Sequence, residues 1–174
     1  MRSWFMGLCF VLWAMPAMAI TAKPPEIATV IASEKPYGEA RLRKLGFHVY
    51  DASLWHDGDT WQIDSLYALT LTYAMNFTPQ ELAERSIEEM RRTTAISDAV
   101  ETSRYTRLIK LFPTVKPGDR ITALYQPPGN VSFFHNGTPT GSIAEPDFAR
   151  AFMGIWLSDK TSEPVMRSRL IRQP

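Results

Sequence analysis

The chain has 174 residues, with 19 lysine and arginine residues against 18 aspartate and glutamate residues and a formal net charge of +1. So small a net charge excludes the broad basic footprint that nucleic acid or an anionic membrane surface would require, so we expect no nucleic-acid partner. The single cysteine is Cys9. Beyond this residue, disulfides, thiolate nucleophiles and cysteine metal ligands are therefore excluded.

The first 19 residues have the pattern of a secretory signal peptide. One arginine precedes an apolar run over residues 4–13, and Ala17 and Ala19 form an A-x-A cleavage pattern. The run is too short to cross a bilayer, and Pro16 interrupts it. We therefore predict cleavage after Ala19, a periplasmic or secreted location, no membrane span in the mature chain, and a single domain over residues 20–174.

The first half of the mature chain predicts mainly strands. Residues 26–33 read as a first strand, and residues 40–55 read as one long strand or two strands joined at Gly46. A turn is expected at Asp57-Gly58. In the next strand, over residues 67–75, large and small side chains alternate. Its large face carries Tyr67, Leu69, Leu71, Tyr73 and Met75, and its small face carries Ala68, Thr70, Thr72 and Ala74. The small face predicts light cover, or a space that something else fills.

Two helices follow this strand. Thr78 is placed as the N-cap of the first, with Pro79 at its first position and Glu81 able to close a capping box. The EEMRR stretch at its end is interpreted as a solvated face. The second helix is expected to end before Pro113, with an apolar stripe formed by Val100, Tyr105, Leu108, Ile109 and Phe112.

The last part of the chain predicts a hairpin and terminal helices. Strands are expected over residues 119–126 and 131–135, and Asn136-Gly137 is the strongest short signal for a hairpin turn. Apolar residues at helical spacing over residues 146–157 predict a helix, with a shorter one through Met166 and Leu170. This order of elements predicts an α+β fold with an antiparallel sheet.

The order of these segments resembles the chalcone isomerase-like family, specifically its exported bacterial branch. The resemblance covers about residues 37–171, and its most specific parts are Val49-Tyr50 followed by Leu54, Gly118-Asp119, Asn136-Gly137 and the helix over 152–157. It implies an open-faced β-sandwich, in which a large antiparallel sheet packs against helices with a cleft between them.

The family resemblance implies two kinds of function. Plant members are intramolecular lyases that close a chalcone to a flavanone by means of an arginine and of threonine and tyrosine hydroxyls, whereas other members bind fatty acids or act as non-catalytic helpers. The nearest arginines here are Arg41 and Arg43, and both stay open. The threonine position falls on Leu45, and the nearest catalytic tyrosine is Tyr105. The polar partners of that tyrosine would fall on Leu108 and Phe112, so chalcone chemistry is disfavoured.

The remaining polar residues have simpler interpretations. His48, His56 and His135 lack the ligand spacing of a metal site, and we expect neither a metal nor a cofactor. Asp51 is interpreted as a strand-end or backbone-capping carboxylate, and strict alternation places His48 on the same face as Tyr50.

Five residues remain as candidate ligand contacts: Arg41, Arg43, Tyr50, Tyr73 and Tyr105. The two arginines lie either on an exposed strand face or at a cleft mouth beside a ligand carboxylate, and Tyr50 and Tyr73 are either core tyrosines or ligand contacts. We expect a non-enzymatic domain that binds a small apolar or fatty-acid-like ligand. The alternatives are an isomerase on an enone-like substrate, with Arg43 as its anchor, and a protein-interaction module with a closed cleft.

Overall fold

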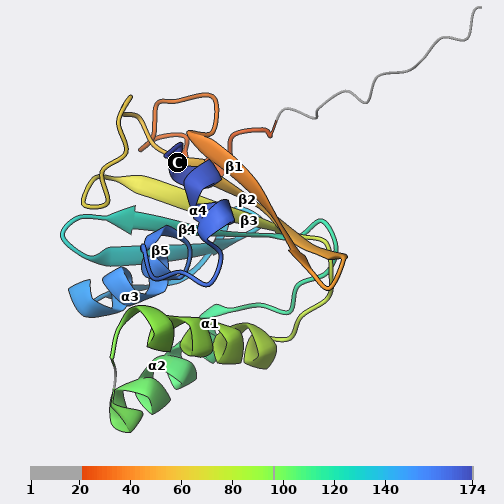
Figure 1. Ribbon diagram of the computed structural model, residues 1–174, viewed down its shortest axis with the longest axis vertical. Coiled ribbons are helices and arrows are strands. Elements are labelled where there is room, and N and C mark those ends of the chain that lie inside the picture. The colour runs from red at the N-terminus through yellow and green to blue at the C-terminus, as the bar shows by residue number, and fades with distance from the viewer. Residues whose placement is uncertain (1–20, 96, 174) are drawn as a thin grey trace, which may run out of the picture.

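The computed structural model describes residues 21–95 and 97–173, so the predicted signal peptide lies outside the described residues. Six strands form one antiparallel sheet in chain order (Figure 1). The strands are β1 (Gly38–Lys44), β2 (Phe47–Trp55), β3 (Tyr67–Tyr73), β4 (Arg120–Gln126), β5 (Asn130–His135) and β6 (Thr138–Ala144). The helices are α1 (Pro79–Thr93), α2 (Asp98–Leu111), α3 (Pro146–Leu157) and α4 (Pro164–Ile171), with a 3-10 turn, η1 (Pro25–Ile27). This architecture confirms the expected α+β fold.

Two tight turns join neighbouring strands at the positions that the sequence indicates. Leu45 and Gly46 connect β1 to β2 with φ angles of 51° and 85°, so the two-strand alternative for residues 40–55 is confirmed. Asn136 and Gly137 connect β5 to β6 with φ angles of 50° and 90°. Positive φ at both central residues matches the right-handed twist of the paired strands.

An irregularity in β2 changes which side chains share a face. Leu42 pairs with Tyr50, but the next residue, Arg43, pairs with His48, so Val49 is an extra residue in β2. This bulge shifts the alternation by one position. His48 therefore lies with Asp51, at 3.2 Å between Nε2 and Oδ2, and not with Tyr50 as strict alternation predicts.

The helix that follows β3 begins with the predicted capping box. The Thr78 hydroxyl accepts a hydrogen bond from the Glu81 amide, and the Glu81 carboxylate accepts one from the Thr78 amide. These contacts satisfy donors that the first helical turn leaves unpaired. The other three predicted helices are also present, but Val100, expected in the apolar stripe of α2, is 41% exposed.

The strand predicted over residues 26–33 is wrong. These residues form η1 and a following turn, because Pro24 and Pro25 supply no amide hydrogens for strand pairing. Ile27 and Ile31 lie one turn apart, joined by a 2.9 Å hydrogen bond from the Ile31 amide to the Ile27 carbonyl. Both side chains are buried against Trp55, where they cover the sheet.

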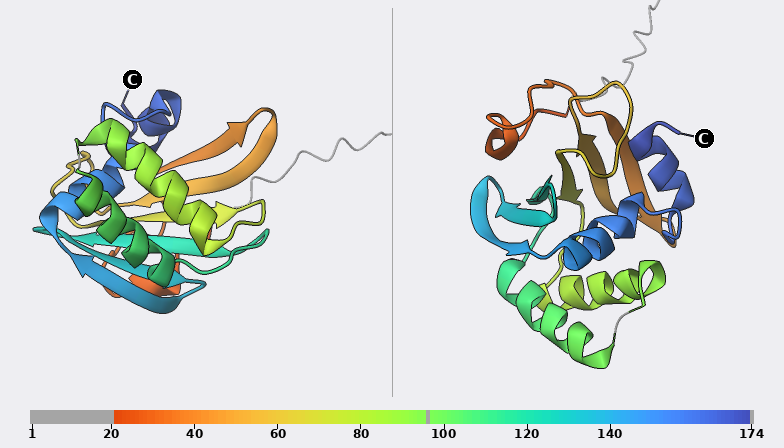
Figure 2. Two further views of the ribbon diagram at one scale, coloured as in Figure 1. Left: turned by 90° about the horizontal axis from the view of Figure 1, so that it is seen from below. Right: turned by 90° about the vertical axis from the view of Figure 1, so that its left-hand side faces the viewer.

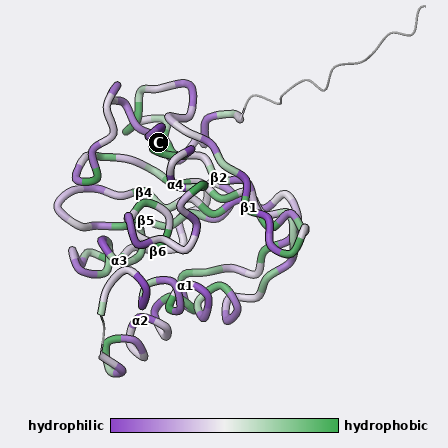
Figure 3. Tube along the Cα trace, in the orientation of Figure 1, coloured by the Kyte–Doolittle hydropathy of each residue, from purple (hydrophilic) through white to green (hydrophobic). Residues whose placement is uncertain are grey.

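The sheet has helices on one face and the N-terminal segment on the other (Figure 2). The large residues of β3 face the helices, whereas Ala68 packs with Ile27 and Ile31 beneath the N-terminal segment. Hydrophobic and hydrophilic residues alternate along α1 and the strands (Figure 3). The light cover predicted for the small face is therefore provided by the N-terminal segment. Among the described residues, no helix combines the length and the apolar character needed to cross a membrane.

Candidate functional site

A cavity of about 720 Å³ lies between α1 and the helix-facing side of the sheet. α1 packs against α2 and α3, which in turn contact the sheet, so α1 stands off from the strands and leaves this space. The wall includes residues of β1 to β4, α1, α3 and the segments after β3 and α3. Its apolar members are Leu42, Phe47, Val49, Leu69, Leu71, Met75, Phe77, Leu82, Phe112, Ile121, Ala123, Phe152, Ile155 and Trp156.

The floor of the cavity follows from the period of β3. Leu69, Leu71 and Tyr73 alternate toward the helices and all three line the cavity. On the opposite side, Leu82, Arg85 and other α1 residues three or four positions apart share one helix face. Alternate residues of β3 therefore line one side of the cavity, and α1 residues three or four positions apart line the other.

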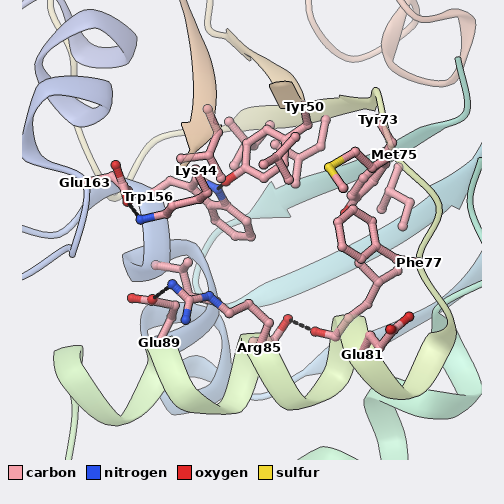
Figure 4. A pocket seen from close by; sticks show the side chains of 18 of the residues that line it. Lys44, Tyr50, Tyr73, Met75, Phe77, Glu81, Arg85, Glu89, Trp156 and Glu163 are labelled. Carbon is pink, nitrogen blue, oxygen red and sulfur yellow. Dashed lines mark hydrogen bonds and ion pairs between the residues drawn. The ribbon is translucent and has the colours of Figure 1, made fainter. Parts of the chain in front are cut away.

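A hydrogen bond between two aromatic residues connects the helix side of the cavity to the sheet side. The indole Nε1 of Trp156, on α3, donates a 2.9 Å hydrogen bond to the hydroxyl of Tyr50, on β2 (Figure 4). Because Tyr50 accepts this bond, its own hydroxyl hydrogen remains available to a ligand. Burial disfavours the charged form and raises the pKa of Tyr50 from 10.0 to about 12. Tyr50 is therefore a neutral hydroxyl at physiological pH.

Tyr73 lies beside Tyr50 in the cavity wall. The ring centroids of the two tyrosines are 5.9 Å apart in an edge-to-face arrangement, and Phe77 makes a similar contact with Tyr73 at 5.8 Å. Burial is the main cause of a raised pKa for Tyr73, and the neighbouring Tyr50 adds to it. Both tyrosine hydroxyls thus belong to an apolar, aromatic wall.

The charged residues of the wall are paired with one another. Arg85, on α1, forms an ion pair with Glu89 one turn further along, and Lys44, on β1, forms one with Glu163, which precedes α4 (Figure 4). Glu89 is buried, at 4% exposure, whereas the Arg85 side chain is half-exposed. The wall therefore combines an apolar surface with two internal ion pairs.

The structure brings together only two of the five predicted contacts. Tyr50 and Tyr73 line the cavity, and Tyr105 packs against the core elsewhere. Arg41 lies on the opposite face of the sheet, where its Nε is 2.6 Å from Asp51 Oδ1. Arg43 lies outside the wall, with Nη1 3.4 Å from the Gly46 carbonyl oxygen. Both β1 arginines thus lie outside the cavity wall, and the arginine that lines the wall is Arg85 of α1.

Several other expectations change with the geometry. Asp51 pairs with Arg41 and His48 side chains, so the backbone-capping interpretation is wrong. Leu45, at the position of the family threonine, is 98% exposed at a turn, and Phe112 lies in the cavity wall. The described residues contain no group of three or more histidine, cysteine or acidic side chains placed to hold a metal ion.

Sequence reasoning missed both Arg85 and Glu89: Glu89 belongs to the EEMRR stretch that reads as a solvated face, and Arg85 carries no motif of its own. Their spacing of four residues, in phase with Leu82, is the signal that could have placed them toward the sheet. Trp156 is buried, at 8% exposure, and also lines the cavity. No local signal indicates its bond to Tyr50, which lies more than 100 positions earlier.

Residues 37–171 match a family model described as chalcone isomerase-like, which is more than half of the chain. The chain belongs to the chalcone isomerase-like family. Among solved structures, the fold is similar to that of a fatty-acid binding protein from Arabidopsis thaliana, with a TM-score of 0.60 and 14% identity over 79% of this chain and 86% of that chain. No curated protein matches the sequence. At this identity the likeness shows the shared fold.

Proposed function

We propose that this member of the chalcone isomerase-like family is a non-enzymatic binding protein that holds a small apolar or fatty-acid-like ligand between α1 and the sheet. The observation that carries the proposal is the cavity itself, whose wall is mostly aliphatic and aromatic. Its volume of about 720 Å³ falls within the usual range of ligand pockets, about 300–1,000 Å³. The fatty-acid binding protein of similar fold supports the same class of ligand.

The geometry favours binding over the two alternatives. A lyase anchored on Arg43 would need that guanidinium in the cavity, and Arg43 lies outside its wall. A closed-cleft interaction module would need a filled interior behind Tyr73, where the structure has the cavity instead. Binding in the cavity is the function that both observations support.

We also propose that the chain is exported and belongs to the exported bacterial branch of the family. The proposal is based on the apolar run over residues 4–13 and the A-x-A pattern that ends at Ala19. Intact mass measurement of protein from its own cells should give a mature chain beginning at Ile20. A folded protein that retains Met1 to Ala19 would contradict export by this route.

The binding function is tested by native mass spectrometry of protein purified from its own cells, followed by organic extraction. We expect a bound apolar molecule, and a rise in the melting temperature when a matching lipid is added. Ala123→Phe fills the cavity from β4 and should abolish both signals, whereas Ala144→Phe, on an exposed position of β6, should preserve them. Recovery of no lipid, together with no thermal shift across fatty acids and neutral lipids, would reject the proposal.

A further inference from the structure

The charged side chains of the cavity wall are two cations and three carboxylates: Lys44, Arg85, Glu81, Glu89 and Glu163. Lys44 is paired with Glu163, and Arg85 with Glu89. The Glu81 carboxylate instead accepts the hydrogen bonds of the α1 capping box, which lower its pKa. The wall therefore carries an excess of negative charge, and each of its cations already has a carboxylate partner.

Arg85 is held more tightly than a single ion pair implies. Its Nη1 is also 2.7 Å from the exposed Glu88 carboxylate, and Arg92 approaches the other oxygen of Glu89 at 3.5 Å. A ligand carboxylate that took the Nη2 donors of Arg85 would replace Glu89 in this ion pair. Because Glu89 is buried, that exchange would weaken the pairing of a carboxylate that has little access to water.

The hydroxyls of the wall offer a different kind of contact. Tyr50 accepts from Trp156 and keeps its own hydrogen for a ligand acceptor, and burial keeps this hydroxyl neutral. The Ser86 hydroxyl is already used, since it donates a 2.7 Å hydrogen bond to the Leu82 carbonyl. The wall thus offers a neutral donor to a ligand oxygen, surrounded by aromatic and aliphatic side chains.

We infer that the cavity takes a neutral lipid, one whose hydroxyl or carbonyl oxygen accepts a hydrogen bond from Tyr50, in preference to an ionised fatty acid. This inference rests on the binding function proposed above and narrows its ligand class. The ion pairs of Arg85 and Lys44 then stay intact when the ligand binds. The aromatic residues of the wall contact the ligand instead.

The test compares two ligands with the same chain, 1-dodecanol and dodecanoate, at pH 7.5 and below their aggregation limits. The change in intrinsic tryptophan fluorescence, to which Trp156 in the wall contributes, gives the two dissociation constants and is checked by calorimetry. We expect dodecanol to bind about tenfold more tightly than dodecanoate, or better. Dodecanoate binding as tightly as dodecanol, or more tightly, would overturn the inference while leaving the binding function intact. Binding of neither ligand to lipid-free protein would count against both.

A charge-releasing variant makes the test sharper. Glu89→Gln keeps the side-chain shape but frees Arg85 and Arg92 from a carboxylate, so dodecanoate should gain about tenfold in affinity while dodecanol changes little. Glu84→Gln is the matched control, because it removes the same charge from the same helix at an exposed site outside the wall. A ratio of the two affinities that is equal in the wild type and in both variants would contradict the inference.

A second variant tests the same inference independently in case Glu89→Gln does not fold. Tyr50→Phe removes the proposed donor and should weaken dodecanol binding several-fold, with a smaller effect on dodecanoate. Melting temperatures of all variants report on folding independently. Unchanged dodecanol affinity in folded Tyr50→Phe would remove Tyr50 as the recognising group and overturn the inference as stated.

Discussion

The hydrogen bond from Trp156 Nε1 to the Tyr50 hydroxyl joins the helix layer to the sheet at the cavity wall. The donor lies on α3 and the acceptor on β2, so the bond crosses between the two layers that enclose the ligand space. A contact at this place affects both the stability of the fold and the shape of the cavity.

Tyr50→Phe should lower the free energy of unfolding by about 1–2 kcal/mol, because the indole N–H of Trp156 then loses its partner in a partly buried position. Urea denaturation measures the change. A double-mutant cycle with Trp156→Phe isolates the pair from the cost of the smaller ring, and it should give a coupling of about 1 kcal/mol. A coupling near zero would show that the bond does not contribute in solution.

Alkaline pH should destabilise the wild type through the same residue. The pKa of Tyr50 is about 12 in the folded state against 10.0 for an unperturbed tyrosine, so between these values the unfolded chain loses a proton that the folded chain retains. Stability from this group is fully present below pH 10 and falls as the pH rises toward 12. Denaturation midpoints measured from pH 8 to pH 12 should fall less steeply in Tyr50→Phe than in the wild type. Parallel curves for the two proteins would show that Tyr50 is not the cause of the alkaline loss of stability.

Two glycine substitutions should have opposite effects. A Cβ on Gly38 would lie 2.0 Å from the Leu170 carbonyl oxygen, so Gly38→Ala must push α4 away from β1 and should cost about 1–3 kcal/mol. Gly154, inside α3, has ordinary contacts at 3.5 Å, and Gly154→Ala should stabilise the protein by up to about 1 kcal/mol. Thermal melts of both variants test the contrast, and a stable Gly38→Ala would mean that α4 does not pack as described.

Leu45 is an unfavourable residue for its turn. It has a φ of 51° and is 98% exposed, so its side chain gains no burial for a backbone conformation that costs about 1–2 kcal/mol for most residues. Leu45→Asn should raise the free energy of unfolding by about 1 kcal/mol, because asparagine tolerates this conformation. Leu45→Ala removes the same exposed surface without that preference and serves as the control. Equal stability of the two variants would contradict the explanation.

Local patterns predicted most of the fold. The capping box at Thr78 and the Asn136-Gly137 turn each depend on a few neighbouring residues, and both appear in the structure as expected. The strand predicted over residues 26–33 failed because its isoleucines fit a helical turn as well as a strand. The missing amide hydrogens of Pro24 and Pro25, together with the packing of Ile27 and Ile31 against the sheet, decide between them.

The candidate site was less predictable because it depends on long-range contacts. Tyr50 and Tyr73 face the cavity because β2 and β3 pair at these two residues, which strand alternation can indicate. The orientation of Arg85 and Glu89 depends instead on how α1 stands off from the sheet. The sequence also could not predict which face of the sheet holds the cavity, since both faces of β3 carry apolar residues.

The extra residue at Val49 also determines which chemical groups β2 contributes to the cavity wall. With regular alternation from Tyr50, His48 would point into the wall and Phe47 would point away, whereas the bulge reverses this and places Phe47 in the wall. One inserted residue thus substitutes a benzene ring for a protonatable imidazole beside the ligand space. The side chain at this position of the wall then does not change its charge over the pH range in which imidazoles gain and lose protons.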